Sequence, residues 1–555
     1  MNEFIRGYLA ARPLQASALG FHEYDGRIGE FTRLAIDAEL ARLGRFEERL
    51  KRFDVIKLSP SAAINLRVLQ AAIAKELLLL RDLAIYEHNP IYYANAIDVN
   101  VYAMRRYSPL EDRVRSMIAV ENQTGNVVIA AKTNLVEVLP KPFVELAIKI
   151  ARGSAEFLRR SLMDSITDLK DENLRATLVQ ANRRAAIALT DYASWLEKER
   201  LPKATAPFAI GEERYQRFLA QTELIDLSLS KALELGMAEL EHEQEVFKEA
   251  AKKISADKPA SEVFKQIQGE HPPPENLVSE MGRRLDSVRR FVVENKLITI
   301  PTEIRAQVKV SPQFLRPISF TYFDGPGPFE KRSLDAYLYL TPPESDWSEE
   351  RKNEWLTRFN SYSADLLAIH EGYPGQYVQS LRLNASKADK PQKLFGAASF
   401  LGGWAHYCEK MMIDAGYGSR FGPDPTDEEV QQSAKYRMAQ AQQAMILFAR
   451  LCVSIRMHTQ GMSVEDATRF FQENCYSQEA PAHLEAIRAT FDLGYLSDAI
   501  GTLEIRKLRE DYEIQEGEDF SVKRFHNEVL NNGALPIRLL RETMLTEQTK
   551  WDDPL

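Results

Sequence analysis

His370 and Glu371, adjacent in the stretch LLAIHEGYPGQY, are the residues most able to carry chemistry. On a helix, a histidine–glutamate pair followed one turn later by a second histidine can bind zinc through the imidazoles, while the glutamate takes a proton from the attacking water. Here the residue one turn after His370 is Pro374, which has no ligand atom and disturbs a helix. A straight helix turns about 100° per residue, so only a kink or helix end at Pro374 would bring Gln376 back toward His370. By itself the pair is more typical of a helix end with a hydrogen-bonded histidine.

The elements that must position this pair are predicted to be mainly helical. Apolar residues recur at helical spacing from about 27 to 290. Four segments rich in β-branched and aromatic residues then follow, LITIP, RAQVKV, ISFTYFD and DAYLYLT, and they predict three or four short strands between about 297 and 341. Ser348 fits the start of a helix over about 348–373 that carries His370, and helices return up to the C-terminus.

We therefore expect a mainly α fold of the α+β class, with a large helical block, a small sheet and a second helical block. Residues 1–290 are predicted to form an N-terminal helical region, and residues 291–555 a region that carries the candidate chemistry. The two regions are expected to form one compact unit around a cleft. The chain has 555 residues, a length that one large helical enzyme can reach.

Composition excludes several classes of protein. Hydrophobic residues make up 45% of the chain and charged residues 27%, which are globular values. The 71 Lys and Arg against 80 Asp and Glu leave a net charge of -9, which argues against a nucleic-acid-binding protein. The sequence contains neither a G-x-G-x-x-G or Walker loop for nucleotides nor the G-x-S-x-G turn of serine hydrolases.

The cysteines and the hydropathy pattern point to a cytoplasmic protein. Cys408, Cys452 and Cys475 are too few for a disulfide framework and are expected to be buried and reduced. Arg6 and Arg12 interrupt the first apolar stretch, so no signal peptide is expected. The sequence contains no run of 18 apolar residues, so no membrane span is expected.

Three strings of the sequence carry a resemblance to a known family. HEGYPGQY begins at His370, FLGGWAHYCEKMM covers Phe400–Met412, and RMHTQGMSVEDA covers Arg456–Ala467. They resemble a bacterial family catalogued as domain of unknown function 885, whose motifs read HExxPGHY or HExxPGHH followed by EGWAHYxE. Matches continue over nearly the whole chain. The family is similar to zinc metallopeptidases of the zincin type, so the resemblance implies a large helical zincin-like architecture.

The resemblance also implies functional positions, and this chain departs from several of them. The first histidine ligand falls on His370 and the general base on Glu371, but the second histidine falls on Gln376 and the glutamate of EGWA on Gly402. Glutamine is a poor zinc ligand, and glycine offers no side chain. Two of the three presumed metal ligands are therefore replaced.

A second departure concerns two family tyrosines near the C-terminus. One is retained as Tyr495, and the other is replaced by Asp498. A tyrosine hydroxyl can stabilise the oxyanion of a tetrahedral intermediate, which makes Tyr495 a candidate catalytic residue. His458 and Arg488 match retained family positions and are further candidates, to hold a substrate carboxylate or steady an oxyanion. As lone residues, both are more typical of buried structural polar groups.

His406 and Glu409 are the residues that could replace the lost ligands. Gly402, His406 and Glu409 follow each other at i, i+4 and i+7, on one face of a predicted helix. With His370 they provide two imidazoles and a carboxylate, the donor types of catalytic zinc. The resemblance, however, implies that they surround the metal or the substrate without being ligands. Restoring Gln376→His together with Gly402→Glu is expected to create zinc binding.

Three hypotheses for the function follow. The preferred one is a metallopeptidase-like protein with an incomplete zinc site, catalytically impaired or inactive, that binds peptides or partners. The first alternative is an active zinc-dependent peptidase with His370, His406 and Glu409 as ligands and Glu371 as general base. The second alternative is a metal-free hydrolase. Zinc is expected only in the active form. The expected ligand is a peptide or small-molecule substrate, and neither nucleic acid nor membrane is expected as a partner. The oligomeric state stays open.

Overall fold

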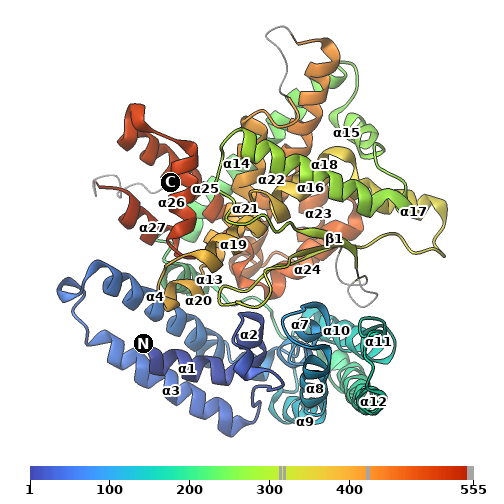
Figure 1. The fold of residues 1–555 in the computed structure, drawn as a ribbon, viewed down its shortest axis with the longest axis vertical. Coiled ribbons are helices and arrows are strands. Elements are labelled where there is room, and N and C mark those ends of the chain that lie inside the picture. Colours follow the sequence, from blue (N-terminus) through green and yellow to red (C-terminus); the bar gives the residue numbers. More distant parts are fainter. Residues whose placement is uncertain (312–315, 317–319, 420–424, 547–555) are drawn as a thin grey trace. The chain divides into compact units, whose positions relative to one another are not determined.

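The computed structural model describes residues 1–311, 316, 320–419 and 425–546. The chain divides into two compact units, which are described one at a time. Unit 1 comprises residues 1–208, 311–320 and 326–335, and unit 2 comprises residues 209–310, 321–325 and 336–555. The fold is mainly helical, as the sequence predicts, with a single small sheet among the described residues (Figure 1).

Unit 1 is built from helices, coloured blue to cyan in Figure 1. The pair α10 and α12 packs together, and α8 and α9 lie against α12. One face of α10 is apolar, and its residues Val144, Ile148 and Leu158 are buried. The helices are α1 (Asn2–Ala11), α2 (Pro13–Ala18), α3 (Arg33–Lys51), α4 (Pro60–Leu77), α5 (Ile85–His88), α6 (Ile91–Ala94), α7 (Asn100–Met104), α8 (Leu110–Glu121), α9 (Thr124–Asn134), α10 (Lys141–Arg159), α11 (Ser161–Asp164) and α12 (Glu172–Trp195).

A cluster around His22 ties the segment 326–335 into unit 1. His22 Nε2 lies 2.8 Å from a carboxylate oxygen of Glu330, and its Nδ1 lies 3.4 Å from Asp25. The imidazole stacks on Tyr107, whose hydroxyl donates to Asp25 over 2.8 Å. Burial disfavours the charged ring, but the hydrogen bonds to Asp25 and Glu330 outweigh it and raise the pKa of His22 to about 9.

This cluster predicts that unit 1 loses stability in mild alkali. A folded-state pKa raised above the ordinary value of 6.5 stabilises the fold fully below pH 6.5, and the contribution disappears as the pH rises through about 9. Because His22 is partly screened by solvent, we expect a loss of about 1–2 kcal/mol between pH 6.5 and 9.5. Urea unfolding at several pH values measures it. His22→Gln should flatten the dependence, and an equally steep dependence in that variant would contradict the assignment.

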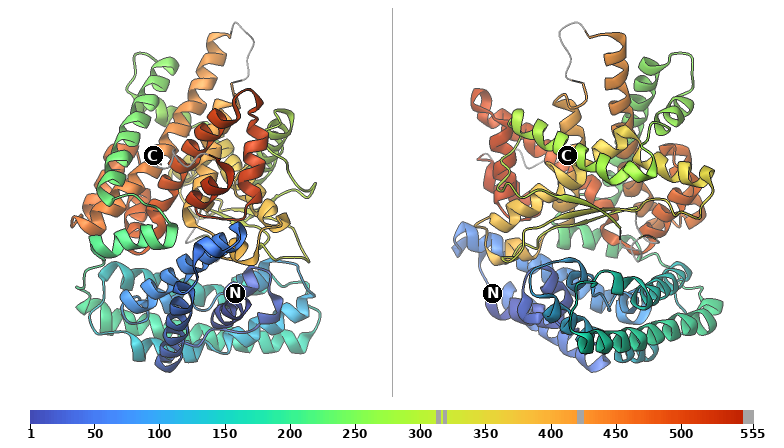
Figure 2. Two further views of the ribbon diagram at one scale, coloured as in Figure 1. Left: turned by 90° about the vertical axis from the view of Figure 1, so that its left-hand side faces the viewer. Right: turned by 45° about the vertical axis from the view of Figure 1, so that its right-hand side comes forward.

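Unit 2 is centred on two pairs of long helices, α14 with α22 and α21 with α25 (Figure 2). Thr426 begins α22 with a capping box, in which Thr426 and Glu429 bond reciprocally to each other's backbone N–H. The helices are α13 (Glu212–Phe218), α14 (Leu229–Ile254), α15 (Ala260–Gln268), α16 (Leu277–Glu294), α17 (Glu349–Leu356), α18 (Ser361–Leu367), α19 (Gln376–Ala385), α20 (Lys390–Leu394), α21 (Ala398–Asp414), α22 (Asp427–Thr459), α23 (Val464–Cys475), α24 (Glu479–Phe491), α25 (Ser497–Glu516), α26 (Val522–Asn531) and α27 (Ile537–Met544).

The sheet lies where the sequence predicts it, between residues 297 and 341. Its strands are β1 (Gln307–Val310), β2 (Thr321–Asp324) and β3 (Tyr337–Leu340), in the order β1-β3-β2. β3 is central and fully buried, pairing in parallel with β1 and antiparallel with β2. The predicted strand LITIP is wrong, because residues 297–301 form no strand. Leu297 and Ile298 are buried directly after α16, so apolar packing explains the composition there.

The helix predicted over 348–373 is present in consecutive pieces. The Ser348 side chain caps α17, as expected, and the Asn360 side chain begins α18 by accepting from two backbone N–H groups. A wider π turn, η9 (Ala368–Gly372), then carries His370 and Glu371. The Asn360 cap explains the break, since its side chain satisfies the N–H groups of a new helix.

The division into units differs from the predicted boundary at residue 290. Residues 209–290 pack within unit 2, because α14 lies along α22 and α16 lies against η9. The three cysteines are buried and unpaired, as predicted. The predicted cleft stays a prediction.

Candidate metal centre

The chain around Pro374 ends one helix and begins another. η9 ends at Gly372, and α19 begins at Gln376 with Gly375 as its first flanking residue. A Cβ at Gly375 would lie 1.9 Å from the His370 carbonyl oxygen, so only glycine permits this close turn. The helix end brings Gln376 back beside His370, with the amide Nε2 of Gln376 3.2 Å from the ring Nε2 of His370.

Trp404 holds this turn against α21. Its ring is fully buried, and its indole N–H donates to the Pro374 carbonyl over 3.0 Å. The ring also packs edge-on against His526. Trp404 therefore fixes how the two segments of the candidate site meet, in addition to filling the core.

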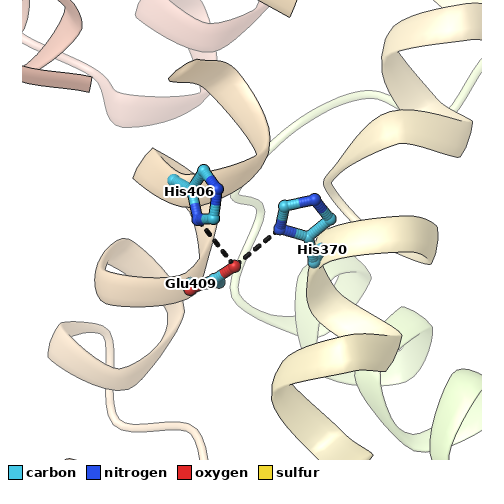
Figure 3. Close-up of side chains that lie close together, drawn as sticks. All are labelled: His370, His406 and Glu409. Carbon is cyan, nitrogen blue, oxygen red and sulfur yellow. Dashed lines mark hydrogen bonds and ion pairs between the residues drawn. The ribbon is translucent and has the colours of Figure 1, made fainter. Parts of the chain in front are cut away.

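His370, His406 and Glu409 converge on one point. One ligand atom of each lies within 4.8 Å of the other two. Figure 3 shows the two imidazoles, from η9 and α21, on either side of the Glu409 carboxylate. Glu409 Oε1 lies 2.6 Å from His370 Nδ1 and 3.1 Å from His406 Nδ1. Among the described residues, this is the one group whose donor types suit a metal ion.

The charges in this group are strongly coupled. Burial opposes ionisation of Glu409, but the two imidazoles outweigh it and hold its pKa down to about 2. Burial likewise opposes the charged form of His370, and the bond to Glu409 outweighs it, so the pKa of His370 is raised. The side chains of His370 and His406 are 19% and 10% exposed, so part of each imidazole borders solvent.

Glu371 lies beside the centre, in the general-base position that the resemblance implies. Its Oε2 is buried and accepts no hydrogen bond from the described residues. Burial raises its pKa, opposed by the charge of His370 and assisted by that of Glu409. A carboxylate with a free lone pair and a raised pKa is suited to accept a proton from water.

Asp498 fills the space that a side chain at position 402 would take. A Cβ built on Gly402 would lie 2.1 Å from Asp498 Oδ1 and 2.8 Å from Oδ2. Two of the three departures from the family motifs, Gly402 and Asp498, thus occur at one place in the fold. The rescue by Gln376→His with Gly402→Glu stays a prediction, and it requires the Asp498 carboxylate to move away from position 402.

The remaining candidates lie outside the converging group. His458 is buried, its ring bonded to the Ala489 carbonyl at 2.9 Å and the Ile210 N–H at 3.4 Å, and burial lowers its pKa to about 4. Tyr495 is buried with no hydrogen-bond partner for its hydroxyl among the described residues. Arg488 is exposed, pairs with Asp492, and stands over the Tyr495 ring at 4.9 Å. Their predicted roles stay predictions.

Sequence reasoning did not single out Arg450. It forms a bidentate pair with Glu485 at 2.8 and 2.9 Å and stands over the Tyr495 ring at 5.2 Å. Its charge also acts on Asp498. One feature of the sequence could have pointed to Arg450. The replacement of a family tyrosine by Asp498 adds a negative charge, and such a charge favours a nearby arginine.

No helix of the described residues is long and apolar enough to span a bilayer. The predicted cytoplasmic location stays a prediction.

Comparison with known proteins gives a family and a fold. A chain from Shewanella oneidensis, described as a "putative lipoprotein of unknown function", has a TM-score of 0.78 at 22% identity over 98% of both chains. A "putative lipoprotein" from Colwellia psychrerythraea has a TM-score of 0.77 at 16% identity, covering 97% of this chain and 96% of that one. No curated protein sequence matches. The family model described as "Bacterial protein of unknown function (DUF885)" matches residues 13–544, so the chain belongs to this family.

Proposed function

We propose that the protein is a divalent-metal hydrolase whose zinc site is formed by His370, His406 and Glu409, with Glu371 as general base. The observation that supports it is the convergence of these three ligands within 4.8 Å. This favours the first alternative from the sequence over the preferred impaired form, because the two lost family ligands need not be repaired if the ion is held by other residues.

The donor set fits zinc. Two imidazoles and one carboxylate are the ligands of many catalytic zinc sites, which keep a further position for water or substrate. Ligand atoms around a tetrahedral zinc ion with bonds of about 2.1 Å lie about 3.4 Å apart. The observed separations from Glu409 are slightly shorter, 2.6 Å for its hydrogen bond with His370 and 3.1 Å for its ion pair with His406.

Gln376 has a role in this site without being a ligand. When His370 presents the lone pair of Nδ1 to an ion, its proton lies on Nε2 and needs an acceptor. Gln376 stands 3.2 Å from Nε2, and a turn of its amide about the last bond presents the oxygen there. The glutamine would thus fix the orientation of His370, as a buried acceptor does for many metal-bound histidines.

The bound ion and Glu371 have different roles in the proposed hydrolysis. A bound zinc ion supplies Lewis acidity for a carbonyl group and lowers the pKa of water. Glu371 takes a proton from the attacking water and holds it on its unpaired Oε2 until the leaving group receives it. Given the family resemblance to metallopeptidases, we propose a peptide or small-molecule amide as substrate, with no nucleic acid or membrane as partner, in the cytoplasm.

A metal-free form is the second candidate, and a specific observation favours it. With its proton on Nδ1, His370 donates to Glu409 and accepts from Gln376, so both ring nitrogens are satisfied without an ion. In that form the protein keeps the fold and binds peptides without cleaving them. The two candidates differ in which nitrogen of His370 carries the proton.

Metal-dependent hydrolysis separates these candidates. The full chain is treated with a chelator, dialysed, and assayed on a mixture of short peptides by mass spectrometry, with and without equimolar zinc. We expect cleavage only with zinc, and its loss on renewed chelation. Cleavage that is equal in both samples would support a metal-free hydrolase, and no cleavage with zinc bound would leave only the binding function.

A further inference from the structure

α21 and α25 approach each other through glycines, and this places Asp498 at the edge of the centre. A Cβ on Gly403 would lie 2.7 Å from the backbone of Gly501, and a Cβ on Gly501 would lie 1.8 Å from the Ser399 carbonyl oxygen. Because the helices lie so close, the first turn of α25 brings the Asp498 carboxylate against the bare backbone of Gly402. Any side chain at 402 would displace it.

The Asp498 carboxylate has no hydrogen bond or ion pair among the described residues. It is half-buried, and neither oxygen is among the fully enclosed, unpaired atoms, so the carboxylate borders accessible space. Its charge interacts most strongly with His406, and it also acts on His370. It does not belong to the group of atoms within 4.8 Å, so it lies beside the metal ligands and is not one of them.

The arginines near Asp498 are already neutralised. Arg450 is held by both carboxylate oxygens of Glu485, and Arg488 pairs with Asp492 at 3.0 Å. Asp498 therefore has no directly bonded partner of its own, and the positive groups that act on its charge, His406, Arg450 and Arg488, do so without a hydrogen bond or ion pair to it. Withdrawing a carboxylate from water lowers the stability of the fold unless a hydrogen-bond donor or an opposite charge pairs with it.

We propose that Asp498 is a specificity-determining residue that binds a positively charged amino group of the substrate. The proposal rests on the proposed function for the position of the scissile bond. An ammonium group supplies three N–H donors and one positive charge, which match a carboxylate that accepts no hydrogen bond and forms no ion pair among the described residues. The amino group belongs either to the N-terminus of a peptide or to a lysine side chain, and both carry the same chemistry.

The expected effect follows from the strength of charged hydrogen bonds. Such bonds change affinity by roughly 10- to 100-fold when one partner is removed. Substrates with a free amino group should therefore bind and react roughly 10- to 100-fold better than acetylated ones. Asp498→Asn keeps the size of the side chain and removes the charge, so it should abolish this preference.

Three probes separate the sources of the amino group. Alanine p-nitroanilide carries a free α-amine, Nα-acetyl-lysine p-nitroanilide carries only a side-chain amine, and N-acetyl-alanine p-nitroanilide is neutral. We would measure kcat/KM with zinc, and binding by calorimetry to the full chain with Glu371→Gln, which should hold the probes intact. We expect one amine-bearing probe to be preferred in both readouts, and the preference to vanish with Asp498→Asn.

Gly402→Ala offers an independent test of the same contact. Its methyl group would push the Asp498 carboxylate from its place, so the single variant should lose the amine preference as Asp498→Asn does. Combining the two should cause no further loss, since both act on one interaction. Glu513→Gln, an exposed charge change on the same helix, is the matched control and should keep the preference.

The outcomes distinguish this proposal from the proposed function. Amine-dependent binding without hydrolysis or zinc would retain Asp498 as the amine site while rejecting the metal hydrolase. Equal binding of all three probes, binding of none, or an unchanged preference with Asp498→Asn would overturn the inference, whatever the hydrolysis shows.

Discussion

Glu371→Gln should lower kcat by about 10²- to 10⁴-fold while the metal content stays unchanged. The amide keeps the size of the carboxyl group but cannot accept the proton of water. Glu371 is not in the group proposed to hold the ion, so its replacement should leave metal binding intact. The burial that raises the pKa of Glu371 also makes the uncharged amide easy to accommodate, so the variant should fold.

The control for this variant is a second buried carboxyl group remote from the centre. Glu243 in α14 is also buried, has two unpaired oxygens among the described residues, and has a pKa raised by burial. Glu243→Gln should leave kcat unchanged. Equal rates for Glu371→Gln and the wild-type protein, with one metal ion bound to each, would remove Glu371 from the mechanism.

His406→Ala should weaken zinc binding by more than about 100-fold. Loss of groups that merely orient metal ligands costs about 10- to 100-fold in affinity, and loss of a ligand itself should cost more. The variant leaves His370 and Glu409 as a two-residue site, which holds zinc poorly. Hydrolysis should fall in parallel, because it depends on the ion.

This variant also separates the two positions that an ion could take around His370. If the ion lies on the Nδ1 side of the ring, His406 is a ligand. If it lies on the Nε2 side, toward Gln376, His406 is dispensable. Titration against a zinc-binding dye measures the affinity, with the exposed His483→Ala as control. Wild-type affinity in His406→Ala would contradict the proposed ligand set.

Local patterns predicted much of the fold and part of the site. The strand segments around 307–340 are recognisable because β-branched and aromatic residues concentrate there, and the Ser348 cap is a local signal. The shared face of His406 and Glu409 follows from helical spacing alone. Their meeting with His370 needed the resemblance or the structure, because it depends on how η9 packs against α21.

Features set by packing between distant segments could not be predicted. Whether Pro374 kinks or ends the helix depends on the close turn at Gly375 and on the Trp404 bond to the Pro374 carbonyl. The contact of Asp498 with Gly402 depends on the approach of α21 and α25. Residues 209–290 have apolar residues at helical spacing, like the segment before them, so the sequence pattern could not assign them to unit 2.

The metal content of the purified full chain, measured by elemental mass spectrometry after dialysis against trace zinc, tests the central claim most directly. We predict about one zinc ion per chain in the wild-type protein and none in His406→Ala. A folded wild-type protein without zinc would contradict the proposed centre, and would mean that Glu409 joins the two histidines only through its hydrogen bond with His370 and its ion pair with His406.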